Sequence, residues 1–170
     1  MGAGSVLYPV RVLPTLHLLV GLPGSGKTTL ARRLEEGHRA LRLTPDEWML
    51  PLFGAGESGD KRWVLENELL WGVAARALSL GVSVVLDYGL WSRAERDDFR
   101  SRGEALGVRV ELLWLDVSQP ELWRRLETRN RDLPPHTFPI SRAELEEWWT
   151  LFQRPGPDEL SQGEWCILTS

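Results

Sequence analysis

The sequence predicts an α/β fold in which five parallel strands form a sheet that helices cover on both faces. Three observations support this prediction. Apolar, β-branched runs of strand length alternate along the chain with segments of helical character, as in parallel sheets. A glycine-rich turn joins the first of these runs to a helix. Helix-start signals directly follow several of the other runs.

The expected strands differ in how clearly the sequence marks them. Three of them have the continuous apolar character of buried parallel strands, and they lie at 15–20, 82–88 and 108–117. Two weaker candidates lie at 40–43 and 164–169. With 42% hydrophobic and 26% charged residues in 170, the composition is that of one globular domain, which we expect to span residues 1–170.

The helix starts are marked by the capping-box pattern, Ser or Thr followed three residues later by Glu. The pattern occurs at Thr44 with Glu47, Ser92 with Glu95, Ser118 with Glu121, and Ser141 with Glu144. A further helix over about 62–80 should end at Gly81. Three of the capping signals follow a strand, so ligands are expected at the carboxyl edge of the sheet.

Charge and hydropathy narrow the classes of partner. The net charge of −4 provides no general attraction to nucleic acid or anionic membranes, which favours a small-molecule ligand. No segment is long and apolar enough to span a bilayer, and no signal-like run begins the chain. We therefore expect a cytoplasmic protein without a membrane partner, and the sequence leaves its oligomeric state open.

Residues 21–29, GLPGSGKTT, match the G-x-x-x-x-G-K-S/T pattern of a phosphate-binding loop. In such a loop, backbone N–H groups and the N-terminus of the following helix bind the phosphates of a nucleotide. Lys27 should neutralise charge that grows during phosphoryl transfer, and the Thr28 hydroxyl should bind Mg²⁺. ATP and Mg²⁺ are the expected cofactors, with nucleotide contacts from Gly21, Gly24, Ser25, Gly26, Lys27, Thr28 and Thr29.

Phosphoryl transfer to an acceptor is the favoured use of this loop. The sequence lacks the guanine-reading N-K-x-D segment that a GTPase switch needs. Ring-forming motors need an additional helical domain, for which 170 residues leave no room. The alternative from another class is a nucleotide-binding regulatory ATPase module that acts through a partner.

At these residues the chain resembles the small P-loop kinases, which include chloramphenicol phosphotransferase, polynucleotide kinases, zeta toxins, and gluconate and shikimate kinases. The segment FQRPGPDE at 152–159 also looks like a C-terminal segment of this group. The resemblance implies a three-layer P-loop NTPase with strand order 2-3-1-4-5 that phosphorylates a hydroxyl of a small molecule or nucleotide. A polynucleotide 5′-hydroxyl is an alternative acceptor, which the acidic net charge disfavours.

The resemblance also implies a catalytic base. In these kinases an aspartate soon after the second strand has this role, and Asp46 lies at that place. A carboxylate that faces the γ-phosphate would contact the substrate and accept the proton of its hydroxyl. Alternatively, Asp46 and Glu47 only complement the helix dipole, with Thr44 as N-cap and Pro45 as the first helical residue.

Charged residues near the end of the third strand are further candidates. Asp87 ends an apolar run and is expected to bind Mg²⁺. Some of the related kinases instead use this carboxylate near the acceptor. The other alternative is that Asp87 only forms a turn at the end of the strand. Arg93 and Arg96 follow on the next helix. They are candidates for orienting an acceptor phosphate or hydroxyl, and a solvated helix face is the alternative.

The segment WRRLETRNR after the fourth strand resembles the lid arginines of the same kinases, and the lid is expected at about 124–140. Arg125 and Arg129 are one helical turn apart and share a face. One would stack on adenine, and the other would reach the phosphates as charge develops. The alternative is solvated surface arginines, with Arg124 or Arg131 in place of either.

Overall fold

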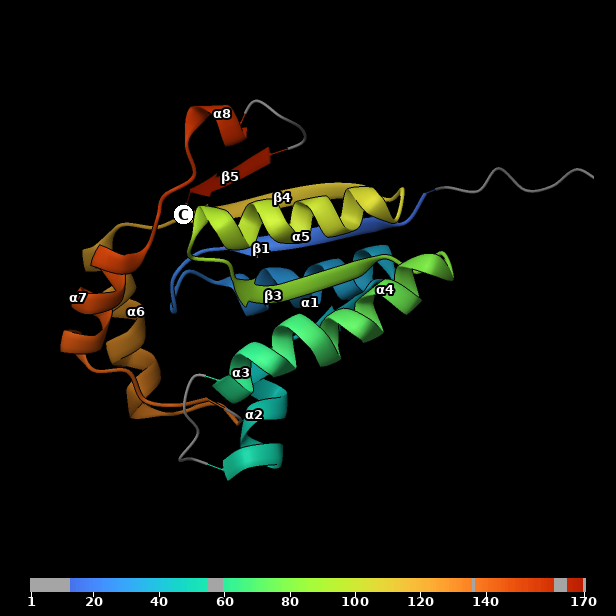
Figure 1. Cartoon of the computed structure of the whole chain (residues 1–170). Helices are drawn as coiled ribbons and strands as arrows, with labels where there is room; N and C mark the ends of the chain where they lie inside the picture. Colours follow the sequence, from blue (N-terminus) through green and yellow to red (C-terminus); the bar gives the residue numbers. More distant parts are fainter. Residues whose placement is uncertain (1–12, 55–59, 136, 161–164, 170) are drawn as a thin grey trace, which may run out of the picture.

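A computed structural model describes residues 13–54, 60–135, 137–160 and 165–169. Its five strands pair in parallel in the order β2-β3-β1-β4-β5, which confirms the predicted sheet. They are β1 (Thr15–Val20), β2 (Leu41–Leu43), β3 (Val84–Gly89), β4 (Arg109–Asp116) and β5 (Trp165–Thr169). All carboxyl ends therefore meet at one edge of the sheet, which lies on the left in Figure 1.

Helices form a layer on each face of the sheet (Figure 1). The helices are α1 (Lys27–His38), α2 (Pro45–Phe53), α3 (Asp60–Val64), α4 (Trp71–Ser79), α5 (Arg93–Ala105), α6 (Gln119–Arg131), α7 (Arg142–Leu151) and α8 (Pro157–Leu160). A π-helical segment, η2 (Leu65–Leu70), joins α3 to α4 in one continuous helix, as expected for 62–80. No helix in the described ranges is long and apolar enough to cross a membrane.

The core follows from the alternation of side chains along the central strand β1. Leu16 and Leu18 are fully buried in a cluster that includes Phe99 of α5. Leu19 points the other way and packs with Ala31 of α1. The two clusters hold the helical layers on opposite faces of the sheet.

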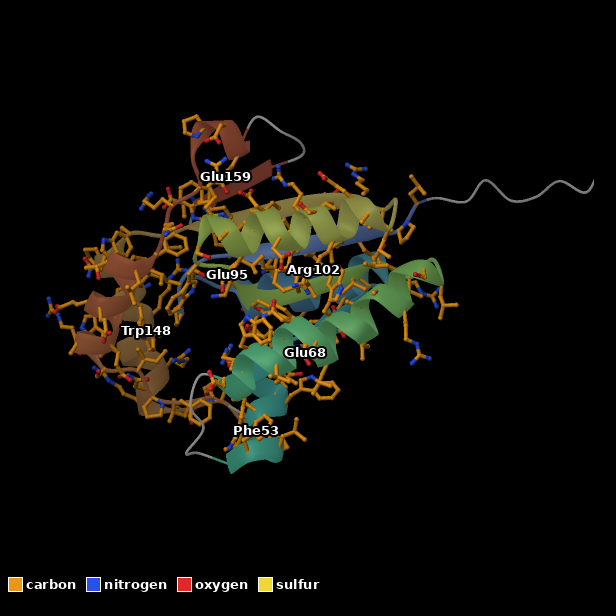
Figure 2. The ribbon with its side chains drawn as sticks, in the orientation of Figure 1. Phe53, Glu68, Glu95, Arg102, Trp148 and Glu159 are labelled. Atoms are coloured by element: carbon orange, nitrogen blue, oxygen red, sulfur yellow. The ribbon has the colours of Figure 1, made fainter. Side chains whose placement is uncertain are left out.

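Helix α5 lies close to the sheet because it carries glycine at its contact point. A Cβ atom at Gly103 would lie 2.6 Å from Val110 Cγ2 and 2.9 Å from Leu16 Cδ2. The neighbouring Arg102 lies between α5 and the helix that contains η2 (Figure 2), where its Nη1 donates to Asn67 O at 3.0 Å. The guanidinium also lies 5.0 Å from the centroid of the Phe99 ring. These contacts fix α5 to both the sheet and its neighbouring helix.

Two of the four predicted capping boxes are confirmed, at the starts of α5 (Ser92 with Glu95) and α7 (Ser141 with Glu144). Thr44 and Ser118 also occupy N-cap positions, but neither side chain makes a capping hydrogen bond. Glu121 instead accepts hydrogen bonds from Arg124 and Arg125. At these two starts the sequence predicted the helix boundary correctly and the side-chain contacts wrongly.

Candidate active site

The glycine loop connects the end of β1 to the start of α1. Gly24 and Gly26 have φ angles of 85° and 99°, in the left-handed region that favours glycine. A Cβ atom on Gly24 would lie 3.1 Å from Leu126 Cγ, so α6 packs directly against the loop. The Gly21 amide donates to Gly89 O at 3.0 Å, which ties the loop to the end of β3.

The geometry of the loop fits a phosphate group. Helix α1 begins at Lys27 without a side-chain cap, which leaves the first N–H groups of a 12-residue helix available for an anion. The Lys27 ammonium donates to Leu22 O at 3.0 Å within the loop. Burial lowers the pKa of Lys27, and the charges of Asp87 and Asp46 oppose this shift. Among the described residues, the buried Ser25 Oγ has no hydrogen-bond partner.

Asp87, at the end of β3, joins the glycine loop to β2. Its Oδ2 accepts hydrogen bonds from Thr28 Oγ1 at 2.8 Å and from Thr44 Oγ1 at 3.1 Å. Only 6% of Asp87 is exposed. Burial raises the pKa of its carboxyl, and Lys27 and the two hydroxyl donors oppose this shift. The Thr44 hydroxyl therefore donates a hydrogen bond to Asp87. The interpretation of Thr44 as an N-cap did not predict this contact.

The donor set of Thr28 and Asp87 fits Mg²⁺. Both residues offer hard oxygen ligands, the kind that Mg²⁺ prefers. No group of three or more His, Cys, Asp or Glu side chains that could hold a metal occurs in the part of the chain that the structure describes. Mg²⁺ is usually bound by one or two protein groups together with waters and substrate phosphates.

Asp46 lies in the first turn of α2 and faces the same edge of the sheet. Its charge acts on the pKa values of both Lys27 and Arg129, so the three groups lie within electrostatic range. Its Oδ1 accepts a hydrogen bond of 2.8 Å from Arg62 Nη1. The neighbouring Glu47 instead binds Arg42 at 2.9 Å.

The two predicted lid arginines reach different parts of the site from α6. Arg125 Nη1 lies 3.4 Å from Ser25 O in the glycine loop, and its Nε donates to Glu121 at 2.6 Å. Arg129 Nη2 donates to Phe138 O at 3.2 Å. Burial lowers the pKa of Arg129, and the charge of Asp46 opposes this shift. Residue 136 of the predicted lid lies outside the described residues.

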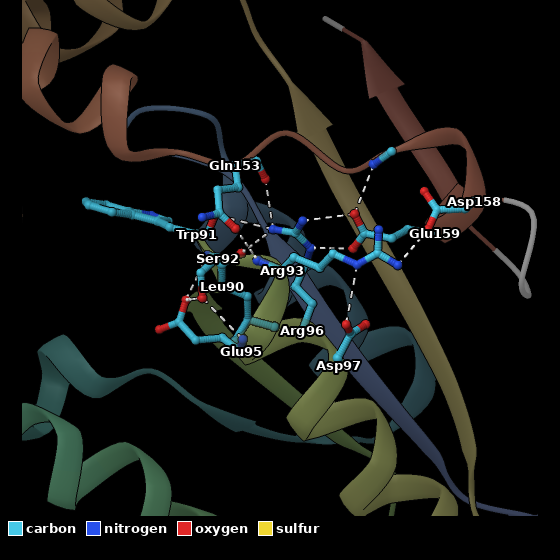
Figure 3. Close-up of polar contacts among 11 residues, drawn as sticks. Leu90, Trp91, Ser92, Arg93, Glu95, Arg96, Asp97, Gln153, Asp158 and Glu159 are labelled. Carbon is cyan, nitrogen blue, oxygen red and sulfur yellow. Dashed lines mark hydrogen bonds and ion pairs between the residues drawn. The ribbon is translucent and has the colours of Figure 1, made fainter.

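Arg96 corrects the sequence prediction. It is 1% exposed, and its Nε and Nη2 bind the two carboxylate oxygens of Glu159 at 2.7 and 3.0 Å (Figure 3). Its Nη1 also donates to three backbone carbonyls, those of Leu90, Trp91 and Gln153. Arg96 therefore fixes the C-terminal segment to α5 and is unavailable to an acceptor, and the alternative of a solvated residue is wrong as well.

Arg93 lies beside this buried pair at the surface. Its Nη2 binds Asp158 at 2.6 Å and its Nε binds Asp97 at 3.4 Å. Half of its side chain is exposed, which fits the alternative of a solvated helix face.

Sequence reasoning missed two residues next to Asp46, the Arg62 and Glu66 pair. Arg62 Nε donates to Glu66 Oε1 at 2.9 Å, and Tyr88 Oη donates to the carbonyl of Glu66 at 3.3 Å. The available signal was an Arg and a Glu four residues apart on an expected helix. That spacing predicts an ion pair but contains no information on its proximity to Asp46.

Comparison with known proteins shows the family and the fold of the chain. A family model described as an AAA domain matches residues 16–155. The structure of Chaetomium thermophilum Kti12 in complex with ADP-AlF3 has a TM-score of 0.67 and 18% identity, covering 89% of this chain and 88% of that one. A gluconokinase from Sinorhizobium meliloti 1021 has a TM-score of 0.61 and 17% identity, covering 94% and 84%.

A third similar structure is a chain of the Pnkp1/Rnl/Hen1 RNA repair complex. It has a TM-score of 0.68 and 22% identity, covering 84% of this chain but 45% of the longer one. At these identities the three structures establish the fold. They confirm the predicted α/β fold with its parallel sheet.

Proposed function

This chain belongs to the AAA domain family, and on that premise we propose that it is an ATP-dependent phosphotransferase with a hydroxyl acceptor. The observation that carries the proposal is the Thr28–Asp87 hydrogen bond of 2.8 Å at the start of an uncapped helix, with Asp46 in electrostatic range of Lys27. This arrangement combines a phosphate site, a metal-binding pair and a separate carboxylate at one edge.

The glycine loop would bind the triphosphate of ATP. The backbone N–H groups of Gly26 to Thr29, at the start of α1, are suited to phosphate oxygens because they are donors at a helix N-terminus. Lys27 would exchange its bond with Leu22 O for a phosphate oxygen and stabilise the negative charge of transfer. The Kti12 structure, which holds ADP-AlF3 in this fold, supports nucleotide binding here.

Thr28 and Asp87 would hold the magnesium ion. When bound, Mg²⁺ neutralises charge on the phosphate oxygens. Asp87 is prepared for this role because Thr28 and Thr44 orient its carboxylate and Lys27 favours its charged form. Both hydroxyls donate to Oδ2, so neither of them occupies Oδ1.

Asp46 would act as the base toward the acceptor. In the reaction, a bond forms between the acceptor oxygen and the γ-phosphorus, and the bond from this phosphorus to the β–γ bridging oxygen breaks. ADP leaves with the electron pair of that bond, and the acceptor proton passes to Asp46. Two arginines of α6 would stabilise the transferring group when the lid closes. Arg129 lies within electrostatic range of Asp46, and Arg125 contacts the glycine loop at Ser25 O.

The experiment that tests this proposal is acceptor-dependent ADP release from Mg·ATP. The panel consists of gluconate and other small hydroxyl compounds and, because of the similarity to the RNA repair complex, 5′-hydroxyl oligonucleotides. Stimulation by at least one panel member, absent in a matched Lys27→Ala preparation, supports transfer. ADP release that no acceptor stimulates would instead favour a regulatory ATPase module that acts through a partner.

A further inference from the structure

Arg62 lies between two carboxylates that come from different helices. Its Nη1 donates to Asp46 Oδ1 at 2.8 Å, and its Nε donates to Glu66 Oε1 at 2.9 Å. Asp46 belongs to α2, whereas Glu66 lies one turn beyond Arg62 on the helix that covers the sheet. A guanidinium is rigid and planar, so its nitrogen atoms cannot move independently. When Glu66 fixes the position of Nε, it therefore also fixes the direction in which Nη1 points toward Asp46.

Glu66 is held in turn by the π-helical segment η2. Two carbonyls of this segment accept hydrogen bonds from side chains outside the helix. Tyr88 of β3 donates to Glu66 O at 3.3 Å, and Arg102 of α5 donates to Asn67 O at 3.0 Å. The segment is thereby fixed to β3 and α5, and Tyr88 directly follows Asp87 in the sequence. A continuous set of contacts thus runs from the end of β3 through η2 to Asp46.

We propose that Arg62 and Glu66 are positioning residues that hold the Asp46 carboxylate toward the attacking oxygen. The inference rests on the proposed function, in which Asp46 accepts the proton of that oxygen. The Asp46 side chain is 47% exposed, so the packing around it does not by itself fix its rotamer. The bond that Arg62 donates to Asp46 selects one orientation of this carboxylate, and the bond that Arg62 donates to Glu66 keeps the guanidinium in place.

The charge of Glu66 changes near neutral pH. Burial raises the pKa of Glu66 to about 7, against the opposing charge of Arg62. The other groups that face it are Asp46 from α2, Glu95 from α5 and the Tyr88 hydroxyl from β3. Above this pKa two carboxylates hold Arg62, and below it the Glu66 side is neutral and binds the guanidinium more weakly. Turnover should therefore fall as the pH drops through about 7.

A double-mutant cycle tests the coupling between Arg62 and Asp46. The probe is Mg·ATP with water as the acceptor, because an attacking water also loses a proton. Arg62→Gln should lower kcat by about 10-fold or more, toward the roughly 10²-fold that a 1 Å misplacement can cost. The KM for ATP should stay unchanged. In the Asp46→Asn background the same substitution should cause no further loss.

The outcomes separate this inference from the proposed function. If Asp46→Asn retains wild-type turnover, the proposed base is wrong. If Asp46→Asn is impaired but Arg62→Gln reduces turnover by the same factor in both backgrounds, Arg62 acts independently of Asp46. In that case the positioning role is overturned and the proposed function stands. Melting temperatures of all four proteins show whether each variant is folded.

The pH profile tests Glu66 and remains informative if Arg62→Gln does not fold. Glu66→Gln should remove the inflection in kcat near pH 7. The control is Glu146→Gln, in the exposed Arg142–Glu146 pair, which has the same four-residue spacing and an N–O distance of 3.0 Å. This control should keep the wild-type profile. An unchanged inflection in Glu66→Gln would overturn the role of Glu66.

Discussion

The Thr28 hydroxyl donates a hydrogen bond of 2.8 Å to the carboxylate of Asp87, across 59 residues of sequence. This bond joins the first turn of α1 to the end of β3, where we propose that Mg²⁺ binds. Asp87→Asn keeps the shape of the side chain but removes its charge. The Mg²⁺ concentration for half-maximal ADP release should then rise by about 10-fold or more, because losing even an outer-shell partner of a metal typically costs about 10- to 100-fold in affinity.

The matched control for Asp87 is Asp116→Asn, at the end of strand β4. Asp116 binds Arg154 at 2.7 Å, on the other side of β1 from Asp87. Its neutralisation should leave the Mg²⁺ dependence unchanged. An equal shift in both variants would mean that Asp87 has no specific part in metal binding.

Lys27 provides the second prediction. Its ammonium is placed in the glycine loop, where it would act on the charge of the transferring phosphate. Lys27→Ala should therefore reduce turnover by about 10²-fold or more, a typical loss for one electrostatic stabiliser. Steady-state ADP release measures the effect, and wild-type turnover in this variant would rule out the phosphate-binding role.

The sequence was sufficient to predict the sheet and the glycine loop because local signals determine both. Apolar runs of strand length mark the strands, and the positive φ angles of Gly24 and Gly26 explain why their spacing identifies the loop. The strand order came from the resemblance to P-loop kinases and agrees with the structure. The boundaries moved by one or two residues, as for β3, which was expected at 82–88 and spans Val84–Gly89.

The errors concern contacts that depend on distant segments. Arg96 looked like a helix-surface residue, but Glu159, 63 positions later, buries and neutralises it. Thr44 is the N-cap residue of α2, but its hydroxyl donates to the buried Asp87 carboxylate and accepts from Arg42 Nη1 rather than from the amides of the helix. The proximity of Arg62 to Asp46 depends on how α2 packs beside the helix that contains η2. Local sequence patterns contain no information on these three juxtapositions.

The Arg96–Glu159 pair should contribute to stability. Both side chains are nearly inaccessible, so Glu159→Gln would leave a buried guanidinium without its counter-charge. Breaking such a pair costs about 3 to 5 kcal/mol, or roughly 6 to 20 °C in melting temperature for a chain of this size. The control is Asp158→Asn, which breaks the half-exposed pair with Arg93 and should lower the melting temperature far less, because solvent screens that pair.

The stability difference between wild type and Glu159→Gln should depend on pH. Burial alone would raise the pKa of Glu159, but the hydrogen bonds from Arg96 and the Gly156 amide outweigh it and the pKa is lowered. A lowered pKa stabilises the fold above the ordinary carboxyl pKa of about 4.3, and this contribution is lost as the pH falls through the folded-state value. Thermal melts that show the same difference in strong acid as at pH 7 would contradict this assignment.

The lid arginines provide a prediction about nucleotide binding. Arg129 is held by Phe138 O, and Asn130 holds the backbone of Ile140, so α6 and the following loop can move as one unit. Binding of an ATP analogue should slow hydrogen exchange over 124–139, with a smaller effect for the GTP analogue. Helix α5 is the internal reference, and unchanged exchange over 124–139 would argue against a closing lid.

The last prediction distinguishes a catalytic base from a helix-dipole partner at Asp46. If the carboxylate only complements the dipole of α2, its neutralisation should cost about 0.3 to 1 kcal/mol of stability and leave turnover almost unchanged. If it accepts the proton of the attacking oxygen, Asp46→Asn should lower turnover by about 10²- to 10⁴-fold, with little change in melting temperature or ATP affinity. Paired thermal melts and turnover measurements separate the two roles.

Glu47→Gln is the control for Asp46, because Glu47 occupies the same first turn of α2 and would act equally on its dipole. Its carboxylate binds Arg42, whereas that of Asp46 lies within electrostatic range of Lys27 and Arg129. A dipole role predicts equal effects in both variants, and a base predicts loss of turnover in Asp46→Asn alone. If both variants retain near-normal turnover, Asp87 is the next candidate, since its carboxylate lies at the same edge and its charge also acts on Lys27.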